Sequence, residues 1–254
     1  MSSMRRIFAV LVLATCVAAA HAQQTLRVAA AADLQPLLPK ILAQFSGQTG
    51  IQTQASYKSS ATLATAIING APFDLFLAAD FSFPQRVIDA GRAEESAPVP
   101  YARGTLVLWA RRDGPFRALS LNSLRSPNLR SVAIANPQHA PYGHAAVAAL
   151  HHLGLYDTLK PKLVVAENIA QAAQFTESGN ALLGFISLTS ALTPRLKASG
   201  YFVVVPSDDY PPILQGAVVV KGSPNAKAAH QFLTYLASGA IARQLEAGGL
   251  AAAH

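Results

Sequence analysis

The chain has very little cysteine, and it lacks the common motifs of hydrolytic and phosphate-transferring enzymes. Cys16 is the only cysteine among 254 residues, so an intrachain disulfide and a cysteine metal site are both excluded. No GxSxG nucleophile motif, HExxH zinc motif, Walker phosphate loop or cleft motif with paired carboxylates occurs. These absences argue against an enzyme, and we expect no cofactor and no resident metal.

Acidic residues are scarce as well, with 13 Asp and Glu against 20 Lys and Arg, which gives a net charge of +7. A mild positive field steers anions toward a protein. The basic residues are scattered, however, and show no run interleaved with aromatic residues. We therefore expect no nucleic-acid partner.

Long apolar runs are absent except at the N-terminus. There, two arginines precede an apolar run over residues 7–20, which closes on the small-x-small pattern of residues 20–22. The run is shorter than the roughly 20 residues of a membrane span, so we predict a signal peptide over residues 1–22 and an exported protein. The alternative is a lipid anchor at Cys16, although Thr15 stands where a lipobox has Gly, Ala or Ser.

The rest of the chain alternates short β-rich runs with stretches of helical period, which is typical of α/β proteins with parallel sheets. The predicted strands cover residues 26–31, 51–57, 74–78, 105–110, 132–135, 163–165, 182–186, 202–205 and 217–220. The predicted helices cover residues 34–45, 62–69, 84–90, 144–152, 169–177 and 226–245, the last interrupted at 238–239.

Two irregular stretches, Pro98–Gly104 and Pro206–Gly216, each adjoin an extended run and are the candidate crossings between two lobes. If the chain crosses at both, the first lobe is discontinuous. It then holds residues 23–104 plus 206–254, and the second lobe holds residues 105–205.

Four strand-to-helix junctions share small or capping residues. They are Ala31-Ala32-Asp33, Ser59-Ser60-Ala61-Thr62, Pro141-Tyr142-Gly143 and Glu167-Asn168-Ile169. Ligands of open α/β sheets bind outside the carboxyl ends of the strands. Helix starts there offer free N–H groups and partial positive charge to an anion. The alternative is that each junction is an ordinary N-cap.

Other polar clusters fit surface roles better. His139, His144, His151 and His152 share their spacing with no carboxylate or cysteine, so a solvated helix face explains them better than a metal site. Residues 208–210, Asp-Asp-Tyr, are interpreted as a polar loop near a hinge.

Six segments resemble the periplasmic molybdate-binding proteins of ABC importers in order and spacing. They are VAAAADL at 28–34, SYKSSATLA at 56–64, GAPFDLFLAAD at 70–80, ANPQHAPYG at 135–143, KPKLVVAE at 160–167 and GFISLTSA at 184–191. The resemblance implies the type II periplasmic binding protein fold, with two lobes, each a mostly parallel sheet flanked by helices. It also implies a monomer that binds molybdate or tungstate between the lobes and delivers it to an ABC permease and ATPase.

Carried over by position, the resemblance places the ligand contacts at Asp33, Ser60, Tyr142, Ile169 and Ser187, with Ser59 and Lys58 as secondary candidates. Ser60 would offer a hydroxyl and an amide. Tyr142 and Ile169 would offer backbone N–H groups, so their side-chain identity would matter little. Two positions depart from the common pattern, which has a serine at position 33 and a tyrosine at position 187.

Asp33 is the serious departure, because an ionised carboxylate repels a dianion and has no proton to donate. It could cap its own helix through the N–H of Gln35. It could pair with Lys58, which could also meet the ligand itself. It could accept a hydrogen bond from a protonated oxyanion. A related alternative is a binding protein of the same fold for a small organic anion or ferric ion, for which Asp33, Tyr57, Tyr142 and Tyr210 are the best evidence.

Overall fold

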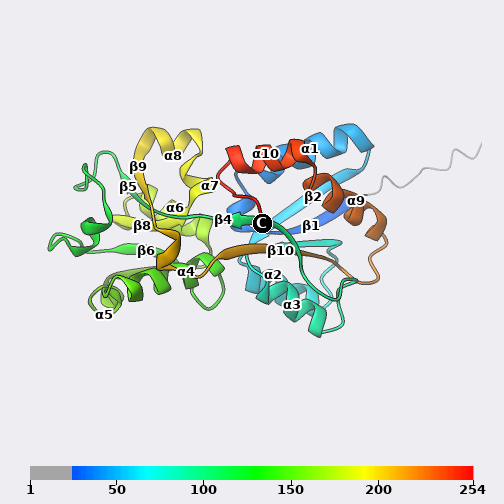
Figure 1. Cartoon of the computed structure of the whole chain (residues 1–254), viewed down its shortest axis with the longest axis horizontal. Helices are drawn as coiled ribbons and strands as arrows, with labels where there is room; N and C mark the ends of the chain where they lie inside the picture. The colour runs from blue at the N-terminus through cyan, green and yellow to red at the C-terminus, as the bar shows by residue number, and fades with distance from the viewer. Residues whose placement is uncertain (1–24, 254) are drawn as a thin grey trace, which may run out of the picture.

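The computed structural model describes residues 25–253, and the strands in this range form two five-stranded sheets that lie side by side (Figure 1). The strands of the first sheet are β1 (Thr25–Ala31), β2 (Gln52–Lys58), β3 (Leu75–Ala78), β4 (Val99–Gly104) and β10 (Ile213–Val219). Those of the second are β5 (Leu106–Arg111), β6 (Val132–Ala135), β7 (Leu163–Ala166), β8 (Leu183–Ser187) and β9 (Gly200–Val204).

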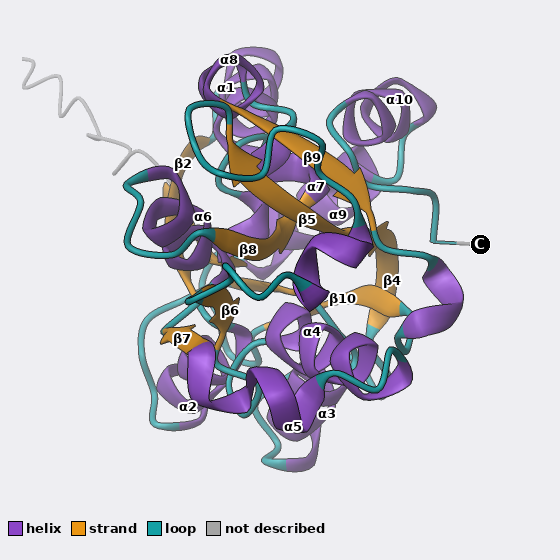
Figure 2. Ribbon diagram, turned by 90° about the vertical axis from the view of Figure 1, so that its left-hand side faces the viewer, coloured by secondary structure: helices purple, strands orange, loops and turns teal. Residues whose placement is uncertain are grey.

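Helices cover both faces of the strands (Figure 2). Beside the first sheet lie α1 (Leu38–Thr49), α2 (Ser60–Ile68), α3 (Ser82–Asp89), α9 (Ala226–Leu236) and α10 (Gly239–Ala247). Beside the second lie α4 (Pro141–His152), α5 (Tyr156–Leu159), α6 (Ile169–Glu177), α7 (Leu188–Ala191) and α8 (Pro194–Ser199). The predicted two-lobe α/β architecture is confirmed.

The two sheets share one topology. Their strand orders are β2-β1-β3-β10-β4 and β7-β6-β8-β5-β9. In the first sheet β10 runs antiparallel to both of its neighbours, and in the second β5 does. The other pairs are parallel, so four of the five strands in each sheet point the same way, and the expectation of mostly parallel sheets is confirmed.

The chain passes between the sheets twice, from β4 to β5 and from β9 to β10. The stretch Pro98–Gly104 was predicted to be irregular, and this was wrong, because most of it forms β4 at the edge of the first sheet. Pro100 is tolerated there because an edge strand can lack one ladder N–H. The second stretch is irregular only up to Ile213, where β10 begins.

Helix α1 shows how the apolar period positions the elements. It begins at Leu38 rather than at the predicted Leu34, with Pro39 in the first turn, where a missing N–H costs nothing. Its inner face buries Ile41 and Phe45, and the Phe45 ring meets Phe232 of α9 edge to face at 5.1 Å. This packing holds α1 and α9 on one side of the first sheet. A short 3-10 turn over residues 32–34 precedes α1 and carries Asp33.

No helix among residues 25–253 is long and apolar enough to cross a membrane. The predicted signal peptide and the alternative anchor at Cys16 lie outside the described residues.

Candidate functional site

The four strand-to-helix junctions line one small cavity of about 10 Å³ between the two sheets. This is about the space that one water molecule needs and far below the roughly 300 to 1,000 Å³ of pockets for drug-sized ligands, so only a very small ligand suits this position. The lining residues are Ala31, Ala32, Asp33, Lys58, Ser59, Ser60, Ala79, Ala140, Pro141, Tyr142, Asn168 and Ile169. Four of the five primary candidates and both secondary ones are therefore brought together.

The lobes are closed over this cavity. The Ala61 N–H at the start of α2 donates to the carbonyl of His139 across the cleft, at 3.1 Å. Ala32 and Ala79 of the first lobe pack in the same apolar cluster as Ala140 of the second. Small side chains at the strand ends allow this close approach.

Three helix starts present unpaired donors. Among the described residues, the backbone N–H groups of Ser60, Tyr142 and Ile169 have no hydrogen-bond partner. The Ser60 hydroxyl accepts from the N–H of Ala79 at 3.1 Å, so its own proton is left to donate. Donors at helix N-termini, each with a partial positive charge, are suited to an anion.

Local caps hold the starts of α2 and α6 in place. Ser59 caps α2 by accepting from the Thr62 N–H at 3.3 Å, and Asn168 caps α6 by accepting from the Gln171 N–H at 3.0 Å. These residues are N-caps as the alternative interpretation expected. The caps do not conflict with a binding role, because they leave the first N–H of each helix free.

Asp33 lies at the centre of the interlobe contacts and is fully buried. Its Oδ2 accepts from the Tyr142 hydroxyl at 3.1 Å and from Nε2 of Gln215 on β10 at 2.5 Å. Its Oδ1 is buried without a hydrogen-bond partner. The expected cap of its own helix is wrong, because the Gln35 N–H donates to the carbonyl of Ala32.

The Tyr142 side chain has a role that was not predicted for an oxyanion site, where only its backbone N–H was expected to matter. Its hydroxyl ties the second lobe to Asp33 of the first and sits where a Cβ on Gly104 would come within 2.3 Å. Glycine at position 104, directly before the crossing into β5, therefore makes room for the hydroxyl.

Ser187 is the one primary candidate that does not line the cavity. It is buried, and its hydroxyl accepts from the Ser190 N–H as the N-cap of α7. Thr189 on the same helix places its hydroxyl 2.8 Å from Ser187 Oγ and 2.7 Å from the carbonyl oxygen of Asp33. The prediction that Ser187 contacts the ligand is therefore corrected. Its hydroxyl oxygen caps α7 and contacts Thr189, which in turn bonds to the carbonyl of Asp33.

Lys58 lines the cavity at the end of β2, but its side chain is exposed. None of the ion pairs among residues 25–253 involves Lys58 or Asp33, so the predicted pairing of these two residues is not found. Asp33 thus has hydrogen-bond donors around it and no partner of opposite charge.

Burial dominates the electrostatics of this region. It raises the pKa of Asp33 to about 6, against the lowering effect of the hydrogen bonds from Gln215 and Tyr142. Burial, followed by the negative charge of Asp33, raises the pKa values of Tyr101 and Tyr142 well above the usual range. Both phenols are therefore neutral hydrogen-bond donors. The Tyr101 hydroxyl donates a hydrogen bond to the carbonyl of Ala78 at 3.0 Å.

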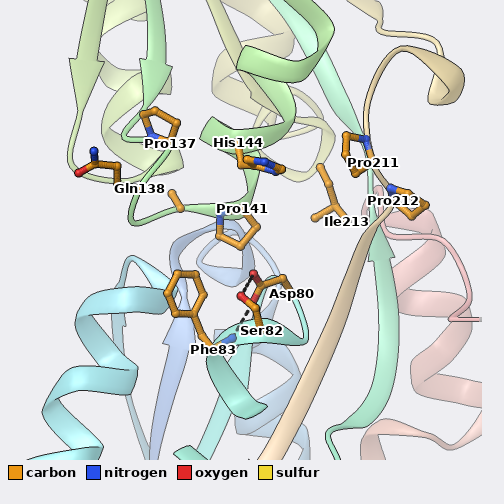
Figure 3. Close-up of a pocket in the computed structure, with 11 residues that line it drawn as sticks. Asp80, Ser82, Phe83, Pro137, Gln138, Pro141, His144, Pro211, Pro212 and Ile213 are labelled. Atoms are coloured by element: carbon orange, nitrogen blue, oxygen red, sulfur yellow. Dashed lines mark hydrogen bonds between the residues drawn. The ribbon is translucent and has the colours of Figure 1, made fainter. Parts of the chain in front are cut away.

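A second, larger pocket opens beside the first, between α3, the start of α4 and the segment that leads into β10 (Figure 3). Asp80 lies on one side of it, where its oxygens accept from the Ser82 hydroxyl and the Phe83 N–H. His144 lies on the opposite side. Burial raises the pKa of Asp80, partly offset by the Ser82 and Phe83 hydrogen bonds and by His144.

The residues proposed as iron ligands do not converge. Tyr142 and Tyr210 direct their hydroxyls to Asp33 and to the N–H of Leu106, and Tyr57 packs against the core of the first lobe without lining the cavity. Among the described residues, no group of three His, Cys, Asp or Glu side chains is placed to hold a metal ion.

Gln215 and Thr189 are the neighbours of Asp33 that the sequence did not single out. A signal existed for Gln215, since a polar residue within the apolar run ILQGAVVV calls for a buried partner. Thr189 gave no such signal.

Comparisons with known proteins identify the family of this chain. The sequence profile of the bacterial extracellular solute-binding protein family matches residues 26–251. The chain is 38% identical to the molybdate-binding protein ModA of Rhodobacter capsulatus over 208 residues, which are 82% of this chain and 81% of that protein. It is 37% identical to ModA of Azotobacter vinelandii over 210 residues, covering 83% of each chain.

Solved structures show the same relationship. The periplasmic molybdate-binding protein of Azotobacter vinelandii superposes with a TM-score of 0.83 at 33% identity, covering 89% of this chain and 98% of that one. The sulfate-binding protein SubI of Mycobacterium tuberculosis shares the fold, with a TM-score of 0.75 at 16% identity. The chain therefore belongs to the bacterial extracellular solute-binding protein family, together with these ModA proteins.

Proposed function

We propose that this protein is the periplasmic substrate-binding component of an ABC importer and that it binds a small tetrahedral oxyanion, molybdate or tungstate. The observation that carries the proposal is the convergence of three unpaired helix-start N–H groups and the Ser60 hydroxyl on one small cavity. Such a site binds an anion without a counter-ion of its own. The molybdate-binding relatives from Rhodobacter and Azotobacter support the choice of ligand.

In this proposal Ser60, Tyr142 and Ile169 contact the ligand directly, Asp33 faces it, and Lys58 lies at the rim. Residues 23–104 with 206–254 form one lobe and residues 105–205 the other, and both close on the ligand. The protein works as an exported monomer that binds and delivers its cargo, with a permease and an ATPase as partners and no catalytic step.

Isothermal titration calorimetry of the chain from Gln23 onward tests the proposal, with molybdate, tungstate, sulfate, phosphate and ferric ion as separate ligands. We expect one site per chain, filled most tightly by molybdate or tungstate. Ser60→Ala should weaken that binding, whereas Ser82→Ala in the neighbouring pocket should leave it unchanged. Binding of ferric ion or an organic anion in place of the oxyanions would refute the assignment.

A further inference from the structure

We infer that the Asp33 carboxyl takes up a proton from solvent when the oxyanion binds, and that it then donates this proton from Oδ1 in a hydrogen bond to the ligand. The inference rests on the proposed function, since it concerns the same cavity. It makes Asp33 a specificity-determining residue that acts as a neutral acid. No proton leaves the ligand, and the bound complex gains one from the buffer.

The two oxygens of the carboxyl group are in different surroundings. Oδ2 accepts from the Tyr142 hydroxyl and from Gln215 Nε2, and both of these groups are donors in that arrangement. A proton on Oδ2 would therefore have no acceptor. Oδ1 is buried and unpartnered, and Asp33 lines the ligand cavity. Oδ1 is thus the oxygen that gains a proton, and a protonated carboxyl group is a hydrogen-bond donor.

No positive charge near Asp33 offsets an ionised carboxylate beside an anion. From β4 and α4, the phenols of Tyr101 and Tyr142 interact with Asp33 and are neutral, and Tyr210 next to Tyr142 is neutral too. The basic residues on these two elements, Arg103, His144, His151 and His152, have no effect on the pKa of Asp33. Asp80 contributes a further negative charge through its interaction with Tyr101.

The other elements that pack against the Asp33 turn bring no compensating cation either. Helix α7 offers the hydroxyls of Ser187, Thr189 and Ser190, and α6 has no ionisable side chain in its first turn. On β2, Lys58 is exposed and unpaired within the described chain. The negative charge of the incoming ligand therefore favours protonation of the Asp33 carboxyl.

The free energy needed to protonate Asp33 near neutral pH is modest, because burial has already raised its pKa to about 6 in the ligand-free protein. A dianion close to the carboxyl raises that pKa further. At pH values where Asp33 is ionised in the ligand-free protein and neutral in the complex, Asp33 takes up one proton for each ligand bound. The dissociation constant then rises about tenfold for each pH unit, starting at about pH 7.

Calorimetry with molybdate tests this directly, because molybdate carries no proton of its own near neutral pH. Titrations at about pH 7.5 in buffers of different ionisation enthalpy give the number of protons taken up. We expect about one per bound molybdate for the wild type. For Asp33→Asn, an isosteric mimic of the neutral acid, we expect none, with affinity independent of pH and higher than that of the wild type at about pH 8.

The matched control is Asp80→Asn, which removes another carboxyl with a raised pKa but keeps a side-chain oxygen that can accept from the Phe83 N–H. It should retain the uptake of a proton. If Asp33→Asn folds poorly, Asp33→Ser provides the same test with a hydroxyl donor.

Three results would overturn the inference. If wild-type protein binds molybdate without proton uptake, or if Asp33→Asn takes up as many protons as the wild type, Asp33 is not the acid, while the proposed function stands. If neither wild type nor variant binds molybdate, tungstate or sulfate at any pH, the proposed function fails and the inference fails with it.

Discussion

Replacing Asp33 by asparagine in the ligand-free protein should stabilise the fold in alkaline solution and not in acid. Asp33 is fully buried, and its pKa is raised from 3.8 to about 6 by loss of solvation. The folded chain therefore holds the proton more tightly than the unfolded chain. The stability contributed by the neutral acid is fully present below about pH 4 and is lost as the pH rises through 6.

The size of the effect follows from the shift of about two pH units. One unit corresponds to about 1.4 kcal/mol, so the ionised carboxyl costs about 3 kcal/mol above pH 7. Asparagine keeps an acceptor for Tyr142 and Gln215, but it places an amide donor at the position of the unpartnered Oδ1. That cost is on the order of 1 kcal/mol. It cancels when the variant is compared with the wild type at two pH values.

Urea unfolding followed by circular dichroism, without molybdate, measures this comparison at about pH 4 and pH 8. The free energy of unfolding of Asp33→Asn relative to the wild type should rise by about 3 kcal/mol between them. Asp113→Asn is the control that should stay nearly flat between these two pH values, because Arg111 lowers the pKa of this exposed carboxyl and moves its titration below the tested range. A relative stability of Asp33→Asn that stays flat with pH would refute the account of a buried, unpaired carboxylate.

Part of the candidate site was predictable from a rule that relates sequence order to space. Parallel strands carry the starts of their following helices at one edge of a sheet, which groups Asp33 with Ser60 in the first sheet and Tyr142 with Ile169 in the second. That these two edges face each other across a cleft was implied by the resemblance to two-lobe binding proteins and not by the order of the elements.

The partners of Asp33 were not predictable, because they lie on elements that are distant in the sequence. Gln215, 182 residues away, lies on β10 of the same sheet, and Thr189, 156 residues away, lies on α7 beside the second sheet. The local sequence favoured a hydrogen bond from the Gln35 N–H to the Asp33 side chain. In the structure this side chain accepts hydrogen bonds from Tyr142 and Gln215 instead. Strand β4 was not predicted because Pro100 within it is compatible only with a strand at the edge of a sheet.

Three further substitutions separate binding from stability. Ser60→Ala should weaken molybdate binding about tenfold, because it removes one hydrogen bond to a charged ligand, and calorimetry measures this loss. Gly200→Ala should lower the melting temperature without changing affinity, since its Cβ would lie 2.0 Å from the Trp109 ring in the second lobe. Gly143→Ala should do both. In a helix, alanine normally gains about 1 kcal/mol over glycine. Here its Cβ would lie 2.2 Å from the carbonyl oxygen of Ala135, so the start of α4 must move away from the end of β6 and take its unpaired N–H with it. Affinities compared at a temperature where both glycine variants are folded decide the point, and an unchanged affinity of Gly143→Ala would show that α4 does not hold the ligand.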